Sequence, residues 1–483
     1  MKHLEDMKHL KRKVYIETLG CQMNFSDSEI MLGLLEKEGF EPTKAKAEAD
    51  LMIINTCQIR GSAESKAYSY LGRWHQFKQK NPNVKIAMAG CVAQQSKDSV
   101  FERMPFIDIV LGTQNIQDLP SLVHKAFAGE KRLLAADKQK ERNTFDYLSD
   151  ITPRRESDIS AWVTIIEGCD YFCTYCVVPY TRGRQISRQP DSILKEVRQL
   201  GEAGFKEITL LGQTVDSYGR DFTDHQFGQK QYGMAELLYA LHEIPGIERI
   251  RFMTSHPLDL NDRIIDAVAE LPKVMEFIHI PMQAGDDEIL KRMRREYTSA
   301  QYYALVDKIY ERIPNASVTG DYIVGFPGET DAQFQNTLAS LKRSGIHMAN
   351  TAAYSPRQQT PAAIWEARGE EIPEAVKEER LAILNEAIAE QSHRINQTYL
   401  GKTVELLVEG VSKRNPNRLM GRTRTNKVVN FDTPLLNKAD DLVGQLVQVK
   451  INEAYPFSFV AEQVFENGTV CPTPAVVSLP IGL

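Results

Sequence analysis

The stretch EGCDYFCTYCVVPYTRGR, residues 167–184, places Cys169, Cys173 and Cys176 on one short segment, and we call these cysteines the loop triad. A structural zinc site usually takes four ligands, and disulfides use cysteines in pairs, so three suits neither purpose. The other cysteines lie far away in the sequence: Cys21, Cys57, Cys91 and Cys471. Three thiolates can ligate three corners of a [4Fe–4S] cluster, which leaves the fourth iron open to bind a small molecule.

Two other interpretations of the loop triad stay open at this point. One is a zinc site that His256 or His279 completes, and the other is three unrelated core cysteines. The C-x3-C-x2-C spacing between a strand pattern and a helix pattern favours the iron–sulfur cluster.

Around the loop triad the sequence alternates strand and helix patterns. Six apolar runs are separated by helical stretches, from AWVTIIEG just before the triad to MANTAAYS. Six β/α units are too few for a complete eight-fold barrel, so residues 159–398 predict a partial (β/α)6 barrel. Enzymes built on β/α barrels have their active sites at the C-terminal ends of the strands, which is where the loop triad lies.

Two further domains flank the predicted barrel, and the fold class is α/β. Residues 12–128 alternate buried strands and helices and predict a doubly wound α/β domain. Residues 129–158 are rich in charge and predict a solvated linker. Residues 399–465 carry short strands and predict a small β-barrel.

A second set of cysteines occurs in the N-terminal domain. Cys21 follows VYIETLG, Cys57 follows LMIINT and Cys91 follows KIAMAG, so each comes just after a predicted strand. The carboxyl ends of parallel strands meet at one edge of an open sheet, which predicts that these three cysteines converge. We call them the strand-end triad and expect a second cluster there, although free cysteines are also common core residues. Cys471 stands in a Thr/Pro/Val-rich tail and is interpreted as unrelated.

The bulk composition is that of an ordinary globular protein. The net charge of −6 over 483 residues argues against a wholly basic nucleic-acid-binding protein. No apolar run reaches membrane-spanning length, and the charged start lacks the apolar core of a signal peptide. We therefore expect a cytoplasmic protein without membrane association, in which thiols stay reduced and clustered cysteines serve metal binding or catalysis.

Residues 411–430 are basic although the chain as a whole is acidic. The stretch holds six cations and no acidic residue: Lys413, Arg414, Arg418, Arg422, Arg424 and Lys427. Such a hairpin can follow a phosphate backbone, and a solvated charged hairpin is the alternative. Arg182, Arg184 and Arg188, beside the loop triad, are expected either to guide RNA or to hold the carboxylate of a cofactor.

The loop triad after the first strand of a partial barrel resembles the radical S-adenosylmethionine superfamily. The resemblance implies that the open iron chelates the methionine part of the cofactor, and that one electron then yields a 5′-deoxyadenosyl radical. It also implies that Tyr175 lies near the adenine. Other polar or small residues at predicted strand ends are expected to contact the cofactor: Gly212, Gln213, Ser255, Gln283, Asp321 and Gly325.

The two triads together closely resemble the methylthiotransferases, over roughly residues 12–465. Members of that family join an N-terminal α/β domain with three separated cysteines, a radical S-adenosylmethionine barrel and a TRAM domain that binds RNA in related proteins. The motifs TLGCQMNFSDSE, NTCQIR and CTYCVVPYTRGR look most like the MiaB-type branch. Three features depart from its pattern: Gln185 where glutamate is expected, Asp216 where asparagine is expected, and RQQTPAA in place of RPGTPAA.

This resemblance implies a reaction and its partners. MiaB-type enzymes add a methylthio group to C2 of N6-isopentenyladenosine at position 37 of tRNA, using two [4Fe–4S] clusters and S-adenosylmethionine as radical source and methyl donor. The expected partners are the tRNA anticodon stem-loop and a reductant protein such as flavodoxin or ferredoxin, and we expect a monomer. Beyond the cluster ligands, no catalytic acid or base is assigned.

Three alternatives to this function remain open. Two are methylthiotransferases with another substrate, either threonylcarbamoyladenosine in tRNA or an aspartate of a ribosomal protein. The third belongs to a different class, a non-catalytic iron–sulfur protein that binds RNA.

Overall fold

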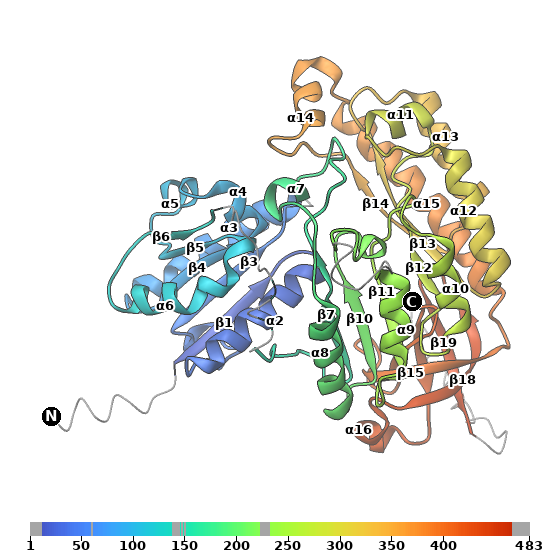
Figure 1. Cartoon of the computed structure of the whole chain (residues 1–483), viewed down its shortest axis with the longest axis horizontal. Helices are drawn as coiled ribbons and strands as arrows, with labels where there is room; N and C mark the ends of the chain where they lie inside the picture. The colour runs from blue at the N-terminus through green and yellow to red at the C-terminus, as the bar shows by residue number, and fades with distance from the viewer. Residues whose placement is uncertain are drawn as a thin grey trace, which may run out of the picture.

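The computed structural model describes residues 12–58, 61–137, 145, 148, 151–222 and 232–465. Cys471 lies outside these residues. The described chain forms an N-terminal α/β domain, a central partial barrel and a C-terminal closed barrel, which confirms the predicted fold class (Figure 1). In the part of the chain that is described, no helix combines the length and apolar character that crossing a membrane requires.

The N-terminal domain is built on a six-stranded parallel sheet in the order β2-β1-β3-β4-β5-β6. Its central strands are fully buried because helices cover both faces, which explains their continuous apolar sequences. The strands are β1 (Lys13–Thr18), β2 (Glu41–Pro42), β3 (Leu51–Thr56), β4 (Lys85–Gly90), β5 (Ile109–Leu111) and β6 (Leu133–Ala135). The helices are α2 (Gln22–Lys37), α3 (Gly61–Lys80), α4 (Cys91–Ser96), α5 (Ser99–Arg103) and α6 (Leu119–Phe127).

The structure corrects the predicted linker of residues 129–158. Strand β6 lies within it and pairs in parallel with β5, and Phe145 and Leu148 are buried in the core beside α2 and α6. The few apolar residues of this segment therefore extend the N-terminal domain. Its high charge concealed them, because composition averages over the exposed and buried positions of a segment.

The central domain contains the six predicted strands, arranged as two three-stranded parallel sheets, β11-β10-β7 and β12-β13-β14. Ile250 connects the two sheets by backbone hydrogen bonds to residues 273 and 275, which precede β12. The strands are β7 (Ser160–Thr164), β10 (Glu207–Leu211), β11 (Arg249–Phe252), β12 (Phe277–His279), β13 (Ser317–Val324) and β14 (Met348–Ala353). The long helix α15 (Glu374–Gln397) packs along β14 and leads to the C-terminal domain (Figure 1).

Shorter elements complete the partial barrel. A two-stranded ribbon of β8 (Ile166–Glu167) and β9 (Ile186–Ser187) encloses the loop triad and the short helix α7 (Val178–Thr181). The outer helices are α8 (Pro190–Glu202), α9 (Met234–His242), α10 (Asp262–Glu270), α11 (Asp287–Arg292), α12 (Ser299–Arg312), α13 (Asp331–Ser344) and α14 (Pro361–Trp365).

The C-terminal domain is a closed barrel in the strand order β15-β16-β17-β19-β18. Alternate residues of each strand point into a small apolar core, as the period of two requires. The elements are β15 (Thr403–Val411), β16 (Leu419–Thr423), β17 (Val428–Asp432), α16 (Ala439–Leu442), β18 (Leu446–Ala454) and β19 (Ser458–Val464).

Polar contacts attach both outer domains to the partial barrel. Helix α2 lies beside β7, where the hydroxyls of Ser26 and Thr164 are 3.0 Å apart (Figure 1). At the N-terminal ends of the barrel strands, the buried Arg249 donates to Glu405 at 2.7 Å and to the carbonyl of Arg422 at 2.9 Å. The C-terminal barrel thus covers the end of the partial barrel opposite to the loop triad.

Candidate functional site

The strand-end triad converges as the sequence predicts. Cys21 is the N-cap of α2, Cys57 follows β3 and Cys91 is the first residue of α4. Their strands β1, β3 and β4 are neighbours in one parallel sheet, so all three cysteines lie at its carboxyl edge.

Backbone and amide contacts fix the edge on which the strand-end triad lies. Asn55 donates to the carbonyl of Asn24 at 2.7 Å, and Asn24 donates to the carbonyl of Thr56 at 3.1 Å. Gly90, just before Cys91, has a φ of +92°, and a Cβ there would lie 2.3 Å from the Thr56 oxygen. Only glycine therefore allows β4 to lead into α4 this close to β3.

The loop triad occupies the loop from β8 to α7 at the mouth of the partial barrel. The Cys169 sulfur lies 3.4 Å from the Thr214 hydroxyl, and Arg295 lies 3.5 Å from the Cys173 sulfur. Neither Thr214 nor Arg295 was identified from the sequence. Thr214 could have been predicted, because it follows Gln213 at a predicted strand end. Nothing in the local sequence distinguishes Arg295.

Burial and hydrogen bonding shift the pKa values of four of the described cysteine thiols. A hydrogen bond with Cys57 lowers the pKa of Cys21 to about 6, whereas burial raises the pKa of Cys91. Burial also raises the pKa of Cys169, and that of Cys176 to about 12. Because thiolates are the ligand form, a metal must displace protons from the loop triad, as is general for cysteine sites.

Neither triad draws its described cysteines together tightly enough for a single metal ion. Among the described residues, no three His, Cys, Asp or Glu side chains group closely enough to hold one metal ion. A zinc ion needs its sulfurs about 2.3 Å from one point, whereas an iron–sulfur cluster is ligated at separate irons. His279 is engaged on both ring nitrogens, by Thr319 at 2.9 Å and Asp321 at 3.3 Å, which argues against a zinc ligand there.

Buried polar atoms without partners mark the mouth of the partial barrel. Within the described chain, Gln213 Oε1, Ser255 Oγ and His256 Nε2 are buried and make no hydrogen bond. They lie just beyond β10 and β11, on the same side of the barrel as the loop triad. Buried polar groups are normally satisfied, so three together at one mouth fit a polar cofactor such as S-adenosylmethionine.

The other predicted cofactor contacts have different surroundings. Tyr175 lies beside the loop triad, near Arg295 and Tyr297, and burial raises its pKa. Gly212 is needed for packing, since a Cβ there would lie 1.9 Å from Ile166 Cγ2. Gly325 turns the chain after β13 with a φ of +68°.

Gln283, beyond the end of β12, is joined to Asp321 within β13. The backbone N–H of Gln283 donates to the backbone carbonyl of Asp321 at 2.8 Å. The side-chain carboxylate of Asp321 accepts from the side-chain amide of Asn350 at 2.9 Å. Their side chains stay partly exposed. The structure therefore brings Tyr175, Gln213 and Ser255 to the mouth beside the loop triad, while the two glycines have structural reasons of their own.

Arg357 connects the surroundings of the two triads. Burial lowers the pKa of its guanidinium, and the charges of Cys57 and Cys176, one from each triad, oppose that shift. Nearby, Gln95 of α4 donates to the carbonyl of Gln358 at 3.2 Å. The two triads therefore face a common region between the N-terminal domain and the partial barrel.

The three arginines beside the loop triad all pair with carboxylates of this chain. Arg182 crosses to the N-terminal domain and pairs with Asp27 at 2.5 Å. Arg184 pairs with Asp170 at 2.6 Å, and Arg188 is buried against Glu196. These pairs could not be predicted, because the sequence does not reveal which carboxylates fold against these cations.

Four of the six basic residues of 411–430 are also engaged within the protein. Arg418 pairs with Asp432 at 3.0 Å and Arg422 pairs with Glu409 at 3.1 Å. Arg424 binds Glu276 of the partial barrel at 2.9 Å, and burial lowers the pKa of Lys427 to about 8. Of the six, Lys413 and Arg414 are exposed.

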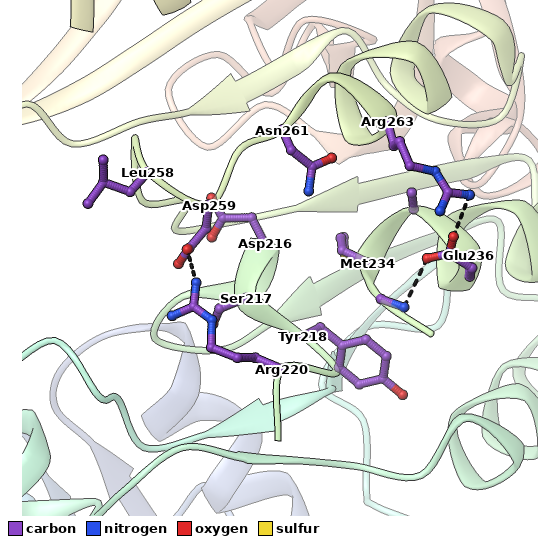
Figure 2. A pocket seen from close by; sticks show the side chains of 12 residues that line it. Asp216, Ser217, Tyr218, Arg220, Met234, Glu236, Leu258, Asp259, Asn261 and Arg263 are labelled. Carbon is purple, nitrogen blue, oxygen red and sulfur yellow. Dashed lines mark hydrogen bonds and ion pairs between the residues drawn. The ribbon is translucent and has the colours of Figure 1, made fainter. Parts of the chain in front are cut away.

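A separate polar pocket of about 260 Å³ lies between the loops that follow β10 and β11 (Figure 2). Asp216, Asp259 and Arg220 line it, and none of the six described cysteines does. Burial raises the pKa of Asp216 well above its usual range, and its carboxylate accepts from the His256 amide at 2.8 Å. The departure at position 216 thus lies in the wall of this pocket, outside both triads.

Comparisons with known proteins agree with this three-domain arrangement. Residues 13–112 match the uncharacterized protein family UPF0004, residues 163–341 match the radical SAM superfamily, and residues 397–464 match the TRAM domain. The fold is similar to that of a radical S-adenosylmethionine methyltransferase, TsrM from Kitasatospora setae, solved with cobalamin and a [4Fe–4S] cluster bound. That similarity has a TM-score of 0.53 at 14% identity and covers 74% of this chain and 75% of that chain.

A second structure of TsrM, with tryptophan substrate and an S-adenosylmethionine analogue bound, gives a TM-score of 0.51 at 13% identity. It covers 74% of this chain and 76% of that chain. At these identities the likeness shows the fold alone.

Proposed function

The chain is a radical SAM protein with the domain architecture of the MiaB/MtaB-type methylthiotransferases, and from this premise we propose that it methylthiolates tRNA. The proposed substrate is N6-isopentenyladenosine at position 37, and the proposed product carries a methylthio group on C2. One observation carries the proposal: two cysteine triads from two domains lie at one junction, where α4, which begins at Cys91, contacts α7, which begins two residues after Cys176.

The loop triad is proposed to hold a [4Fe–4S] cluster with one open iron. When bound, this cluster and S-adenosylmethionine supply the radical chemistry that an unactivated C–H bond such as adenine C2 requires. The chain itself contributes binding and orientation. The buried, unpartnered Gln213 and Ser255 oxygens offer hydrogen bonds to the cofactor, and Tyr175 offers an aromatic surface beside Cys176.

The strand-end triad is proposed to hold a second [4Fe–4S] cluster that carries the transferred sulfur. The low pKa of Cys21 favours ligation, and the Asn24–Asn55 contacts hold the edge of the sheet in place. This cluster would supply the sulfur, and S-adenosylmethionine would supply the methyl group.

The target base must leave its stack to reach a site between two domains, which suits a flexible anticodon loop. The TRAM domain suggests RNA binding, and we propose that Lys413 and Arg414 contribute to it. A small reductant protein such as flavodoxin or ferredoxin is the proposed electron donor.

Mass spectrometry of tRNA nucleosides from a strain that lacks the gene tests this proposal. We expect 2-methylthio-N6-isopentenyladenosine to disappear and N6-isopentenyladenosine to accumulate, and the wild-type gene to restore the product. If 2-methylthio-threonylcarbamoyladenosine or the methylthio-aspartate of a ribosomal protein disappears instead, the reaction class stands and the substrate assignment is wrong.

A further inference from the structure

Arg182 belongs to the partial barrel, yet its side chain reaches into the N-terminal domain, which carries the strand-end triad. It caps α7, a few residues beyond the loop triad, and is 3% exposed. Helix α7 contacts helix α4, which begins at Cys91, and the charge of Arg182 acts on both Cys91 and Cys21. The loop that supplies one set of cluster ligands thus also supplies a cation to the other set.

Two carboxylates hold this guanidinium in place. Asp27, on the N-terminal helix α2, pairs with it at 2.5 Å and is 2% exposed. Glu167, two residues before Cys169, lies 3.9 Å away. A backbone contact supports the junction, since the Thr113 hydroxyl donates to the carbonyl of Thr181 at 2.7 Å.

A buried arginine is costly unless its charge is compensated. Asp27 supplies one charge, but a cluster on three cysteine thiolates adds further negative charge at the same place. Hydrogen bonds to sulfur and the net charge around a cluster set its reduction potential.

We propose that Arg182 is a positioning residue of the strand-end triad, which donates a charge-assisted hydrogen bond to Cys91 and makes the cluster there easier to reduce. Asp27 orients the guanidinium and offsets part of its charge. This inference rests on the proposed second cluster. The reduction potential of the strand-end cluster would then depend on a residue of the partial barrel, the domain that carries the loop triad.

The test measures the midpoint potential of the strand-end cluster alone. The full-length chain carries Cys169→Ala, Cys173→Ala and Cys176→Ala, is reconstituted anaerobically with iron and sulfide, and is titrated with dithionite under electron paramagnetic resonance. Arg182→Gln should shift the midpoint potential to more negative values. Arg182→Lys keeps the positive charge, so its midpoint potential should stay close to that of the parent chain. Asp27→Asn should shift it in the opposite direction, because less of the arginine charge is offset.

A purely structural role does not predict two shifts of opposite sign. Arg188→Gln is the matched control, because Arg188 is equally buried in the same segment but pairs with Glu196. It should leave the potential unchanged. Unchanged potentials for Arg182→Gln and Asp27→Asn, or shifts of the same sign, would overturn the inference while leaving the second cluster in place. If the parent chain assembles no cluster, the proposed function loses its second cluster and the inference falls with it.

Discussion

The loop triad takes its three cysteines from residues 169–176 of one segment, whereas the strand-end triad takes one cysteine from the end of each of three strands. The first set is close in space by covalent connection alone. The second is close only after β1, β3 and β4 have paired in the correct register. A site of the second kind is coupled to the folding of its whole domain, so the two triads should respond differently to the same kind of damage.

Removal of the loop triad should have the largest effect. Cys169→Ala, Cys173→Ala and Cys176→Ala together remove every ligand of the proposed cofactor-binding cluster, so neither 5′-deoxyadenosine nor methylthio nucleoside should form. About half of the iron should remain, on the strand-end triad. Iron analysis and product chromatography measure both, and cofactor cleavage by this variant would show that the loop triad is not the cofactor site.

A backbone change beside Cys91 that removes no thiol should damage the strand-end triad alone. Gly90→Ala combines a φ of +92° with a Cβ placed 2.3 Å from the Thr56 oxygen, at a cost of roughly 3 kcal/mol. We expect a lower unfolding temperature and loss of the strand-end cluster, with the loop-triad cluster kept.

Gly39→Ala is the control for this change. Its φ is +83°, but a Cβ there meets no atom within 4 Å. It should destabilise the domain less and keep all the iron. If both variants lose iron equally, the strand-end cluster does not depend on the close packing of Gly90 against β3.

A smaller effect is expected at the mouth of the partial barrel, on the cofactor and not on either cluster. Ser255→Ala removes a buried hydroxyl that has no partner among the described residues, and one lost hydrogen bond weakens binding by about 0.5–1.5 kcal/mol. Calorimetry should therefore show S-adenosylmethionine affinity lower by roughly 2–10-fold. Ser344→Ala, where the hydroxyl already bonds to Leu341, should leave the affinity unchanged.

The smallest expected effect concerns RNA and should leave both triads intact. Replacing the exposed Lys413 and Arg414 with glutamine should reduce the salt slope of tRNA binding by about 1.5, since each lost phosphate contact contributes about 0.7–0.9. Arg424→Gln should instead weaken the contact between the TRAM domain and Glu276. If Arg424→Gln changes the slope more than the pair does, the hairpin binds phosphate through its paired arginines.

The same contrast explains how far the sequence predicts this structure. Both triads and the six barrel strands were predictable, because spacing and strand ends carry that information directly. The pairing of Arg182 with Asp27, 155 residues apart, was not, because local pattern says nothing about which distant carboxylate a cation meets. For the same reason the ion pairs of Arg418, Arg422 and Arg424 were not predicted, and β6 was hidden in a charged segment.

The most direct test of the division between the triads removes the strand-end cysteines and follows two products in one reaction. Cys21→Ala, Cys57→Ala and Cys91→Ala should leave a chain that is folded by circular dichroism and holds one cluster. Given tRNA, S-adenosylmethionine and a reductant, it should still release 5′-deoxyadenosine but form no 2-methylthio-N6-isopentenyladenosine. A folded variant that still makes the methylthio nucleoside would show that the sulfur does not come through the strand-end triad, and would contradict the account.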